Sequence, residues 1–215
     1  MGKTLTNKRA IIFGGNISEI NLEVCAEIKA TDFIICADAG YKFAFENNIK
    51  PDLIVGDFDS APYPGEAACE IIKLPTHKNQ TDLQFAIEWA LQAGCQDFIL
   101  SGVTGGRLDH TIATISSLHY LSDRSQNFVV WDFNNKLYIV KDVITLQKPN
   151  FDCYISVFSL TENSTGVFIN GAEYPLENAT LVNSFPLGVS NEFKESKVEI
   201  GLKSGKLIVL IVKKD

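Results

Sequence analysis

The most constraining feature of the sequence is an alternation of short apolar runs with helical patterns, which continues to about residue 124 and then stops. The apolar runs are too short for buried helices, and most of them end near glycine or aspartate. This alternation predicts an α/β domain with a mainly parallel sheet that helices cover on both faces. The expected strands are Arg9–Phe13, Phe33–Ala37, Leu53–Val55, Ile71–Leu74 and Phe98–Leu100.

Helices are expected between these strands. The clearest one covers Asp82–Ala93, where an apolar stripe follows a capping box made by Thr81 and Gln84, and Gly94 ends the helix. The other expected helices run from Leu108 to about Leu121, near Tyr41–Asn47, and from an N-cap at Ser18.

From about Phe128 the helical patterns vanish and short strands with regular turn signals follow. This pattern predicts a small all-β sandwich or barrel, so the chain is divided into an α/β domain at 1–124 and a β domain at 125–215. A sandwich of this size is expected to dock on another surface. The expected strands are Phe128–Asp132, Leu137–Val140, Val143–Leu146, Tyr154–Leu160, Thr165–Asn170, Glu173–Leu176 and a terminal hairpin that turns at Ser204-Gly205.

Charge and cysteine content narrow the class of protein. The 215 residues carry a net charge of −7, which argues against nucleic acid as a partner because that role needs a basic face. Residues 1–124 hold 10 Lys/Arg and 16 Asp/Glu, so they carry almost all of the excess acid. The five cysteines are scattered and the apolar runs are short, which predicts a cytoplasmic protein with no membrane partner.

Aspartates follow or precede several predicted elements. Asp38 and the pair Asp57 and Asp59 come after strands, and Asp82 opens the strongest helix. One such aspartate alone is typical of a turn or an N-cap. The Asp-x-Asp spacing, however, places two carboxylates on one side of an extended chain, where a divalent cation relieves their repulsion.

Glycine clusters follow two of the predicted strands. Gly14-Gly15 comes after the first strand, and Gly102-x-x-Gly105-Gly106-Arg107 leads into a helix whose N-terminus favours anions. Arg107 offers a fork of donors for phosphate oxygens. His110 in the next helix fits a structural role as well as a binding one. With the carboxylates, this set suits Mg²⁺-assisted phosphoryl-type transfer, and the lack of a Gly-x-x-x-x-Gly-Lys-Ser/Thr motif excludes a P-loop enzyme.

In this order, the motifs resemble the thiamine pyrophosphokinase family over nearly the whole chain. The segments that carry the resemblance are Ala37–Gly40, Pro51–Ser60, Thr81-Asp82, Gly102–His110, Tyr174–Thr180 and Gly188–Phe193. The resemblance implies a catalytic α/β domain that binds nucleotide and metal, followed by a β-sandwich for thiamine binding and dimerisation. It also implies transfer of a pyrophosphoryl group from ATP to the hydroxyl of thiamine, with Mg²⁺, in a homodimer whose thiamine site lies between subunits.

The resemblance also implies roles for residues at the matching positions. The metal would be held by Asp57, Asp59 and Asp82, which with Arg107 form the catalytic set. Gly105, Gly106 and Arg107 would contact the phosphates. The remaining candidates for substrate binding are Asp38, Lys78, Asp109, His110, Tyr174, Ser190 and Asn191.

The chain departs from the family pattern at two positions. Asn79 stands where many members have aspartate, so it is not assigned to metal, and Tyr174 stands where a tryptophan is common. Tyrosine still offers an aromatic face to a thiamine ring, although a packed edge-strand tyrosine would read the same way. Two alternatives stay open: a metal-dependent nucleotidyl- or glycosyl-transferase that uses the Asp-x-Asp pair, and a non-catalytic protein that binds thiamine or nucleotide.

Overall fold

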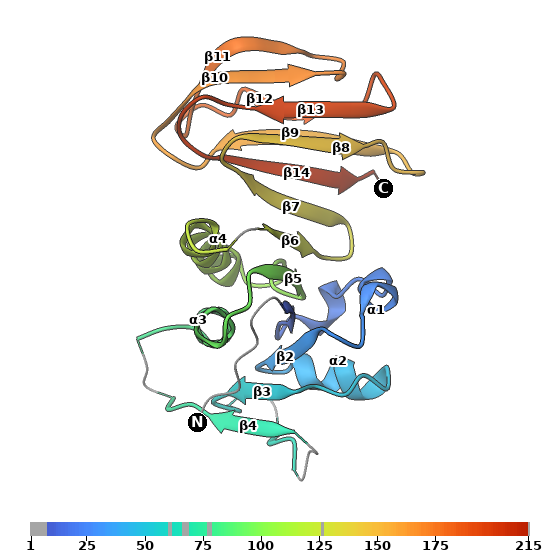
Figure 1. Cartoon of the computed structure of the whole chain (residues 1–215), viewed down its shortest axis with the longest axis vertical. Helices are drawn as coiled ribbons and strands as arrows, with labels where there is room; N and C mark the ends of the chain where they lie inside the picture. Colours follow the sequence, from blue (N-terminus) through green and yellow to red (C-terminus); the bar gives the residue numbers. More distant parts are fainter. Residues whose placement is uncertain (1–7, 60–61, 66–68, 77–78, 126, 215) are drawn as a thin grey trace. The chain divides into compact units, whose positions relative to one another are not determined.

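The structure is a computed structural model that describes residues 8–59, 62–65, 69–76, 79–125 and 127–214 (Figure 1). The chain divides into two compact units, Met1–Phe133 and Asn134–Asp215, named here unit 1 and unit 2. The division lies after Phe133 rather than at residues 124/125. The reason is that strand β6 (Asn127–Trp131) pairs in parallel with β5 (Asp97–Ser101) and so belongs to unit 1.

Unit 1 contains a sheet whose described strands follow the order β6-β5-β1-β2-β3-β4 (Figure 1). All pairings between these neighbours are parallel, which confirms the predicted α/β class. The central strands are buried, as expected for a parallel sheet covered on both faces, and every residue of β2 is buried. The strands not yet given are β1 (Arg9–Phe13), β2 (Phe33–Ala37), β3 (Leu53–Gly56) and β4 (Glu70–Lys73).

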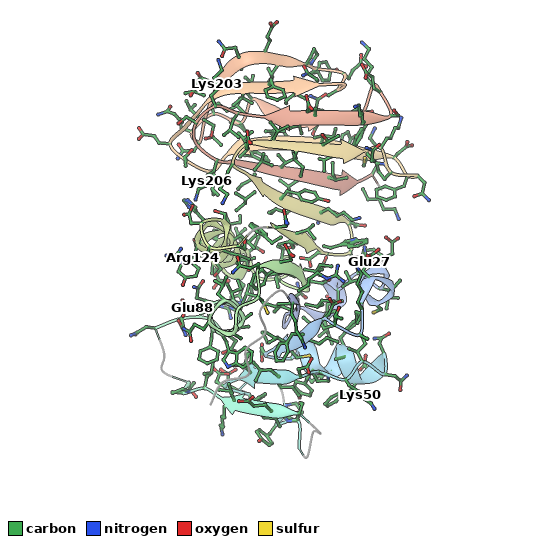
Figure 2. All side chains as sticks on the ribbon, viewed as in Figure 1. Glu27, Lys50, Glu88, Arg124, Lys203 and Lys206 are labelled. Carbon is green, nitrogen blue, oxygen red and sulfur yellow. The ribbon has the colours of Figure 1, made fainter. Side chains whose placement is uncertain are left out.

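Helix α3 (Asp82–Ala93) begins and ends where the sequence predicts. The Thr81 hydroxyl accepts the backbone N–H of Gln84 at 3.1 Å, and Gly94 ends the helix at a left-handed φ of 99°. The side-chain Nε2 of Gln84 donates to Glu88 Oε1 at 2.7 Å, one turn further along the helix (Figure 2 labels Glu88). The Gln84 side chain therefore does not complete the capping box at Thr81. The predicted capping box is therefore formed in one of its two halves.

The prediction of a helix with Ser18 as its N-cap is wrong. Ser18 lies inside a short 3₁₀ helix, η1 (Ile17–Glu19), and its hydroxyl donates to Asn16 Oδ1 at 3.1 Å. Helix α1 (Glu23–Glu27) starts later and is only five residues long, with Leu22 at its N-cap. The apolar spacing in this segment is helical, but the chain turns twice where one helix was expected.

The two remaining helices of unit 1 are α2 (Gly40–Glu46) and α4 (Leu108–Ser122), both close to their predicted bounds. Arg124 lies just after α4 and is labelled in Figure 2. Its guanidinium donates to the carbonyl oxygen of Tyr120 at 2.9 Å and lies 3.7 Å from the centre of that ring. A cation at this position stabilises the carboxyl end of the helix. Among the described residues, no helix is long and apolar enough to cross a membrane.

Unit 2 is a β-sandwich of two antiparallel sheets, as predicted. One sheet has the order β12-β9-β14-β7 and the other the order β11-β10-β13-β8. Its buried core includes Val157 and Val209 from the first sheet and Val167 and Ile200 from the second. The strands are β7 (Asn135–Val140), β8 (Val143–Gln147), β9 (Cys153–Ser159), β10 (Asn163–Asn170), β11 (Leu176–Val182), β12 (Gly188–Asn191), β13 (Lys197–Gly201) and β14 (Leu207–Lys213).

Two predictions about this unit are wrong. The strand predicted at Glu173–Leu176 is not formed, and β11 starts only at Leu176. The last two strands are not a hairpin, because β13 pairs with β8 and β10 whereas β14 pairs with β7 and β9. The Ser204-Gly205 turn instead carries the chain from one sheet to the other. Alternating apolar residues mark both strands as half-buried, but they do not specify the partner strand.

Candidate active site

The order of strands in unit 1 creates a switch point at β1. From β1 the chain builds β2, β3 and β4 on one side, then returns to place β5 and β6 on the other. The chain thus continues from β1 and from β5 to opposite sides of the sheet, and ligands of open α/β sheets bind in the crevice at such a point. A pocket of about 290 Å³ lies at this place, lined by residues 14–16 after β1 and 102–107 after β5.

Close backbone contact explains the first glycines of this pocket. The backbone N–H of Gly14 donates to Ser101 at 2.8 Å, and that of Asn16 donates to Gly102 at 3.0 Å. A Cβ atom on Gly14 would lie 2.4 Å from the carbonyl oxygen of Gly102, so a larger residue does not fit. The loops after β1 and β5 thus meet directly along their backbones.

The second glycine cluster forms the wall of the pocket that leads into α4. Gly102, Gly105 and Gly106 all have positive φ angles, of 73°, 79° and 59°, which glycine adopts without strain. Gly105, Gly106 and Arg107 are exposed and line the pocket just before the N-terminus of α4. Backbone N–H groups and a helix N-terminus at one place suit an anion such as phosphate.

Arg107 is held by the residue that follows it by two positions. Its guanidinium donates to both carboxylate oxygens of Asp109, at 3.1 and 2.6 Å, and the same carboxylate accepts the N–H of His110 at 3.0 Å. These hydrogen bonds, chiefly the one from Arg107, hold the pKa of Asp109 below its ordinary value. Arg107 and His110 line the pocket, whereas Asp109 braces Arg107 from outside it.

Two of the four predicted aspartates line the same pocket. Asp38 follows β2 with a φ of 51°, and its N–H donates to the carbonyl of Val55 on β3 at 2.8 Å. Asp82 begins α3 next to the cap residue Thr81. The structure therefore brings carboxylates from two elements to the glycine loops, as parallel strands that end at one edge require.

The other two aspartates lie in the turn after β3, outside the residues that line the pocket. The carboxylate of Asp57 accepts the backbone N–H of Asp59 at 3.2 Å. Between them Phe58 has a left-handed φ of 58°, an uncommon conformation for a bulky residue, and its ring contacts Tyr41 and Tyr63 edge-on. In the part of the chain that the structure describes, no three His, Cys, Asp or Glu side chains are grouped so that they could hold a metal ion together.

The predicted residues of unit 2 lie in the edge strand β12 and in the segment that links β10 to β11. Tyr174 is 68% exposed, whereas Asn191 is only 4% exposed. Asn191 Oδ1 accepts the N–H of Tyr174 at 2.9 Å, and its Nδ2 donates to the Tyr174 carbonyl at 2.7 Å. Ser190 has a φ of 59°, and its N–H donates to the Ser156 hydroxyl at 3.1 Å. Asn191 thus fixes the backbone that presents Tyr174.

Two residues at or beside the pocket were not predicted from the sequence, and one predicted residue cannot be compared with the structure. Asn16 lines the pocket and its Nδ2 donates to the carbonyl of Thr104 at 2.7 Å. Asp132 accepts hydrogen bonds from the same loop. Both contacts join residues far apart in the chain, so only the position of Asn16 directly after Gly14-Gly15 could have signalled one of them. The predicted substrate residue Lys78 lies outside the described residues.

A parallel α/β unit with a glycine-lined, acid-flanked pocket at its switch point, followed by a β-sandwich, is the architecture of an α/β enzyme with an accessory β domain. Two family models match these parts separately: "Thiamin pyrophosphokinase, catalytic domain" matches residues 24–130, and "Thiamin pyrophosphokinase, vitamin B1 binding domain" matches residues 141–207. Together they cover most of the chain, which belongs to the thiamine pyrophosphokinase family.

Similar proteins agree with this assignment. The chain is 28% identical over 182 residues to a thiamine pyrophosphokinase of Bacillus subtilis, with 82% of this chain and 85% of the relative covered. A crystal structure of thiamine pyrophosphokinase from Bacillus subtilis superposes with a TM-score of 0.86 at 25% identity, over 97% of this chain and 100% of that one. The enzyme from Geobacillus thermodenitrificans superposes with a TM-score of 0.84 at 25% identity, over 96% and 98%.

Proposed function

We propose that this chain transfers a pyrophosphoryl group from ATP to the hydroxyl of thiamine, which gives thiamine diphosphate and AMP. The observation that carries the proposal is the pocket at the switch point, where exposed glycines, a helix N-terminus and Arg107 gather beside Asp38 and Asp82. Membership of the thiamine pyrophosphokinase family supports the choice of thiamine as acceptor. ATP as donor is proposed because a pyrophosphoryl donor offers this pocket several phosphate groups.

In the proposed reaction the hydroxyl oxygen of thiamine forms a bond to the β-phosphorus of ATP. The bond from that phosphorus to the oxygen of the α-phosphate breaks, and AMP leaves. Gly105, Gly106 and Arg107 would bind the transferred or leaving phosphates, because glycines let an anion approach the backbone closely and the guanidinium offers a fork of donors. Asp82 is assigned to orient the hydroxyl and accept its proton, since it is a carboxylate that lines the same pocket.

Magnesium is proposed as the cofactor, held by Asp57, Asp59 and Asp82. The donor type fits, because Mg²⁺ prefers carboxylate oxygens and usually keeps water and substrate phosphates among its ligands instead of a complete cage of protein ligands. A preformed group of three acids, which the described residues do not provide, is therefore not required. When bound, Mg²⁺ neutralises charge that develops on the phosphate oxygens.

Thiamine binding is assigned to residues of unit 2 together with residues of unit 1. Tyr174 offers an exposed aromatic face, Asn191 holds that residue in place, and Ser190 lies beside them. Asp38, Asp109 and His110 complete the proposed substrate-binding set, as does Lys78. The family resemblance also implies a homodimer with thiamine between the α/β unit of one subunit and the sandwich of the other.

Two further features support the proposed homodimer and the proposed cytoplasmic location. Phe185, Leu187 and Val189 expose between 46% and 63% of their surface on unit 2, which suits a surface that a second subunit covers. All five cysteines are free thiols, and burial raises the pKa of the Cys36 thiol well above its ordinary value. Unpaired, unreactive cysteines suit the reducing cytoplasm, where we place the activity.

A product assay tests the proposal. The protein is incubated with ATP, Mg²⁺ and thiamine, and AMP and thiamine diphosphate are quantified. We expect the two products in equal amounts, and an Asp82→Asn variant that melts like the wild type should form little of either. Release of pyrophosphate with a nucleotidylated product would instead favour a nucleotidyl-transferase. Binding of thiamine or ATP without any product would favour a sensor.

A further inference from the structure

Asp132 is a buried carboxylate that the proposed reaction does not use. It follows β6, its exposed fraction is 0%, and it lies between the two segments that match the family models. Its Oδ1 accepts the N–H of Gly102 at 2.6 Å, and its Oδ2 accepts both the N–H of Thr104, at 2.9 Å, and the Thr104 hydroxyl. Both residues belong to the glycine loop that lines the pocket.

Burial makes this carboxylate costly unless its hydrogen bonds repay the loss of water. Burial raises the pKa of Asp132, and the hydrogen bonds from Thr104 and Gly102 oppose that rise. The groups that donate to it in the described part of the chain are neutral. A carboxylate offers two acceptor oxygens to these donors, whereas an apolar side chain would leave them all unpaired. The carboxylate is therefore explained by what it does to the loop.

Three other side chains also hold the loop, two from α4 and one from the segment after β1. Thr114 on α4 donates to the carbonyl of Val103 at 2.7 Å, and Asn16 donates to the carbonyl of Thr104 at 2.7 Å. Thr111 on α4 accepts the N–H of Gly105 at 3.1 Å. Residues 102–104 are thereby fixed against the protein, while residues 105–107 are exposed to the pocket.

We propose that Asp132 is a positioning residue for the phosphates of the pyrophosphoryl donor. It fixes Gly102 and Thr104, so that the backbone of Gly105 and Gly106 and the guanidinium of Arg107 meet the phosphates without having to be ordered first. A loop ordered in advance binds its ligand more tightly, because ordering no longer opposes binding. This inference rests on the proposed function for the identity of the donor.

The test compares Asp132→Asn with the wild type, and with Asp142→Asn as a control at an exposed residue of unit 2. The asparagine keeps an acceptor for Gly102 but places an NH₂ group against the N–H of Thr104. Steady-state kinetics and calorimetry with inorganic pyrophosphate are measured. We expect the KM for ATP and the Kd for pyrophosphate to rise about tenfold in Asp132→Asn, with the KM for thiamine unchanged. A merely structural role would instead lower the active fraction, and with it kcat, and leave both constants unchanged.

If Asp132→Asn does not fold, a second pair of variants tests whether the contact between Asp132 and Thr104 supports phosphate binding. Thr104→Val removes the hydroxyl that Asp132 accepts, whereas Thr104→Ser keeps it. We expect Thr104→Val to weaken pyrophosphate binding severalfold and Thr104→Ser to restore it. Wild-type pyrophosphate binding in Asp132→Asn, or in Thr104→Val where Asp132→Asn does not fold, would overturn the inference. A wild-type protein that binds pyrophosphate but makes no thiamine diphosphate would overturn the proposed function instead.

Discussion

The proposed site has two sides, the glycine loop after β5 and the acidic turn after β3, and different groups shape each of them. Residues 102–105, after β5, are fixed by side chains that precede η1, follow β6 and project from α4. In the turn after β3, Asp57 accepts the N–H of Asp59, and the ring of Phe58 packs against Tyr41 of α2 and against Tyr63. The glycine side is thus ordered by the fold before any ligand binds. Under the proposed function, the acidic side binds the cation and the glycine side binds the phosphates.

The largest effect is expected on the acidic side. Asp57→Asn should lower turnover at least about 100-fold, because it removes a charged ligand for the cation that neutralises the phosphates. The variant should keep its melting temperature and its pyrophosphate affinity without Mg²⁺, since the glycine loop is untouched. Activity close to that of the wild type at saturating Mg²⁺ would contradict the division of labour between the two sides.

A smaller loss is expected on the glycine side. Arg107→Lys keeps the charge but removes the bidentate fork, and should raise the KM for ATP about tenfold with little change in kcat. Asp109→Asn is the matched variant, because it removes the carboxylate that accepts both guanidinium donors and leaves Arg107 in place. Its KM should lie between those of the wild type and Arg107→Lys. If the KM for thiamine rises instead, the assignment of Arg107 to phosphate is wrong.

Unit 2 extends the comparison to a third region, which is also held by side-chain bonds. Asn191→Ala should raise the KM for thiamine severalfold and leave the KM for ATP unchanged, because Tyr174 loses two backbone hydrogen bonds that fix it. Tyr174→Ala should have a similar effect, and the double variant should be little worse than either alone. Additive losses would mean that Asn191 acts independently of Tyr174.

The smallest expected effect concerns stability against pH. Because burial raises the pKa of Asp132 in the folded protein, ionisation of this carboxylate favours the unfolded chain. The free energy of unfolding should therefore fall as the pH rises from about 4, the ordinary carboxyl value, through the raised pKa of Asp132. In Asp132→Asn this carboxylate is absent, so the free energy of unfolding does not fall for this reason. The stability advantage of the wild type over the variant, measured by urea titration, should therefore shrink as the pH rises. A difference that grows with pH would mean that the hydrogen bonds outweigh burial.

Much of the fold could be predicted because its signals are local. Arg9–Phe13, Phe33–Ala37 and Asp82–Ala93 have the predicted bounds, since each combines a clear apolar pattern with a cap or glycine at its end. Sheet partners are not local, so the switch from β13 to β14 between sheets and the place of β6 in unit 1 were missed. Alternation marks a strand as half-buried without naming its neighbour.

The residues of the candidate site also separate into those with a local sequence signal and those without one. The glycine and acidic motifs could be found because each lies at the end of a predicted strand or the start of a helix, and parallel strands bring such ends together. Asn16 and Asp132 were not found in this way. Their hydrogen bonds join them to Thr104, which lies 88 residues from Asn16 and 28 residues from Asp132 in the chain. No pattern of residue types encodes that contact.

The most direct test of the account follows the phosphates themselves. The protein is incubated with Mg²⁺, thiamine and ATP labelled at the α-phosphate, and the nucleotide products are separated. Transfer of an intact pyrophosphoryl group predicts that all of the released label is in AMP, in an amount equal to the thiamine diphosphate formed. Label in ADP, with thiamine monophosphate as an intermediate, or label attached to thiamine, would contradict the proposed reaction.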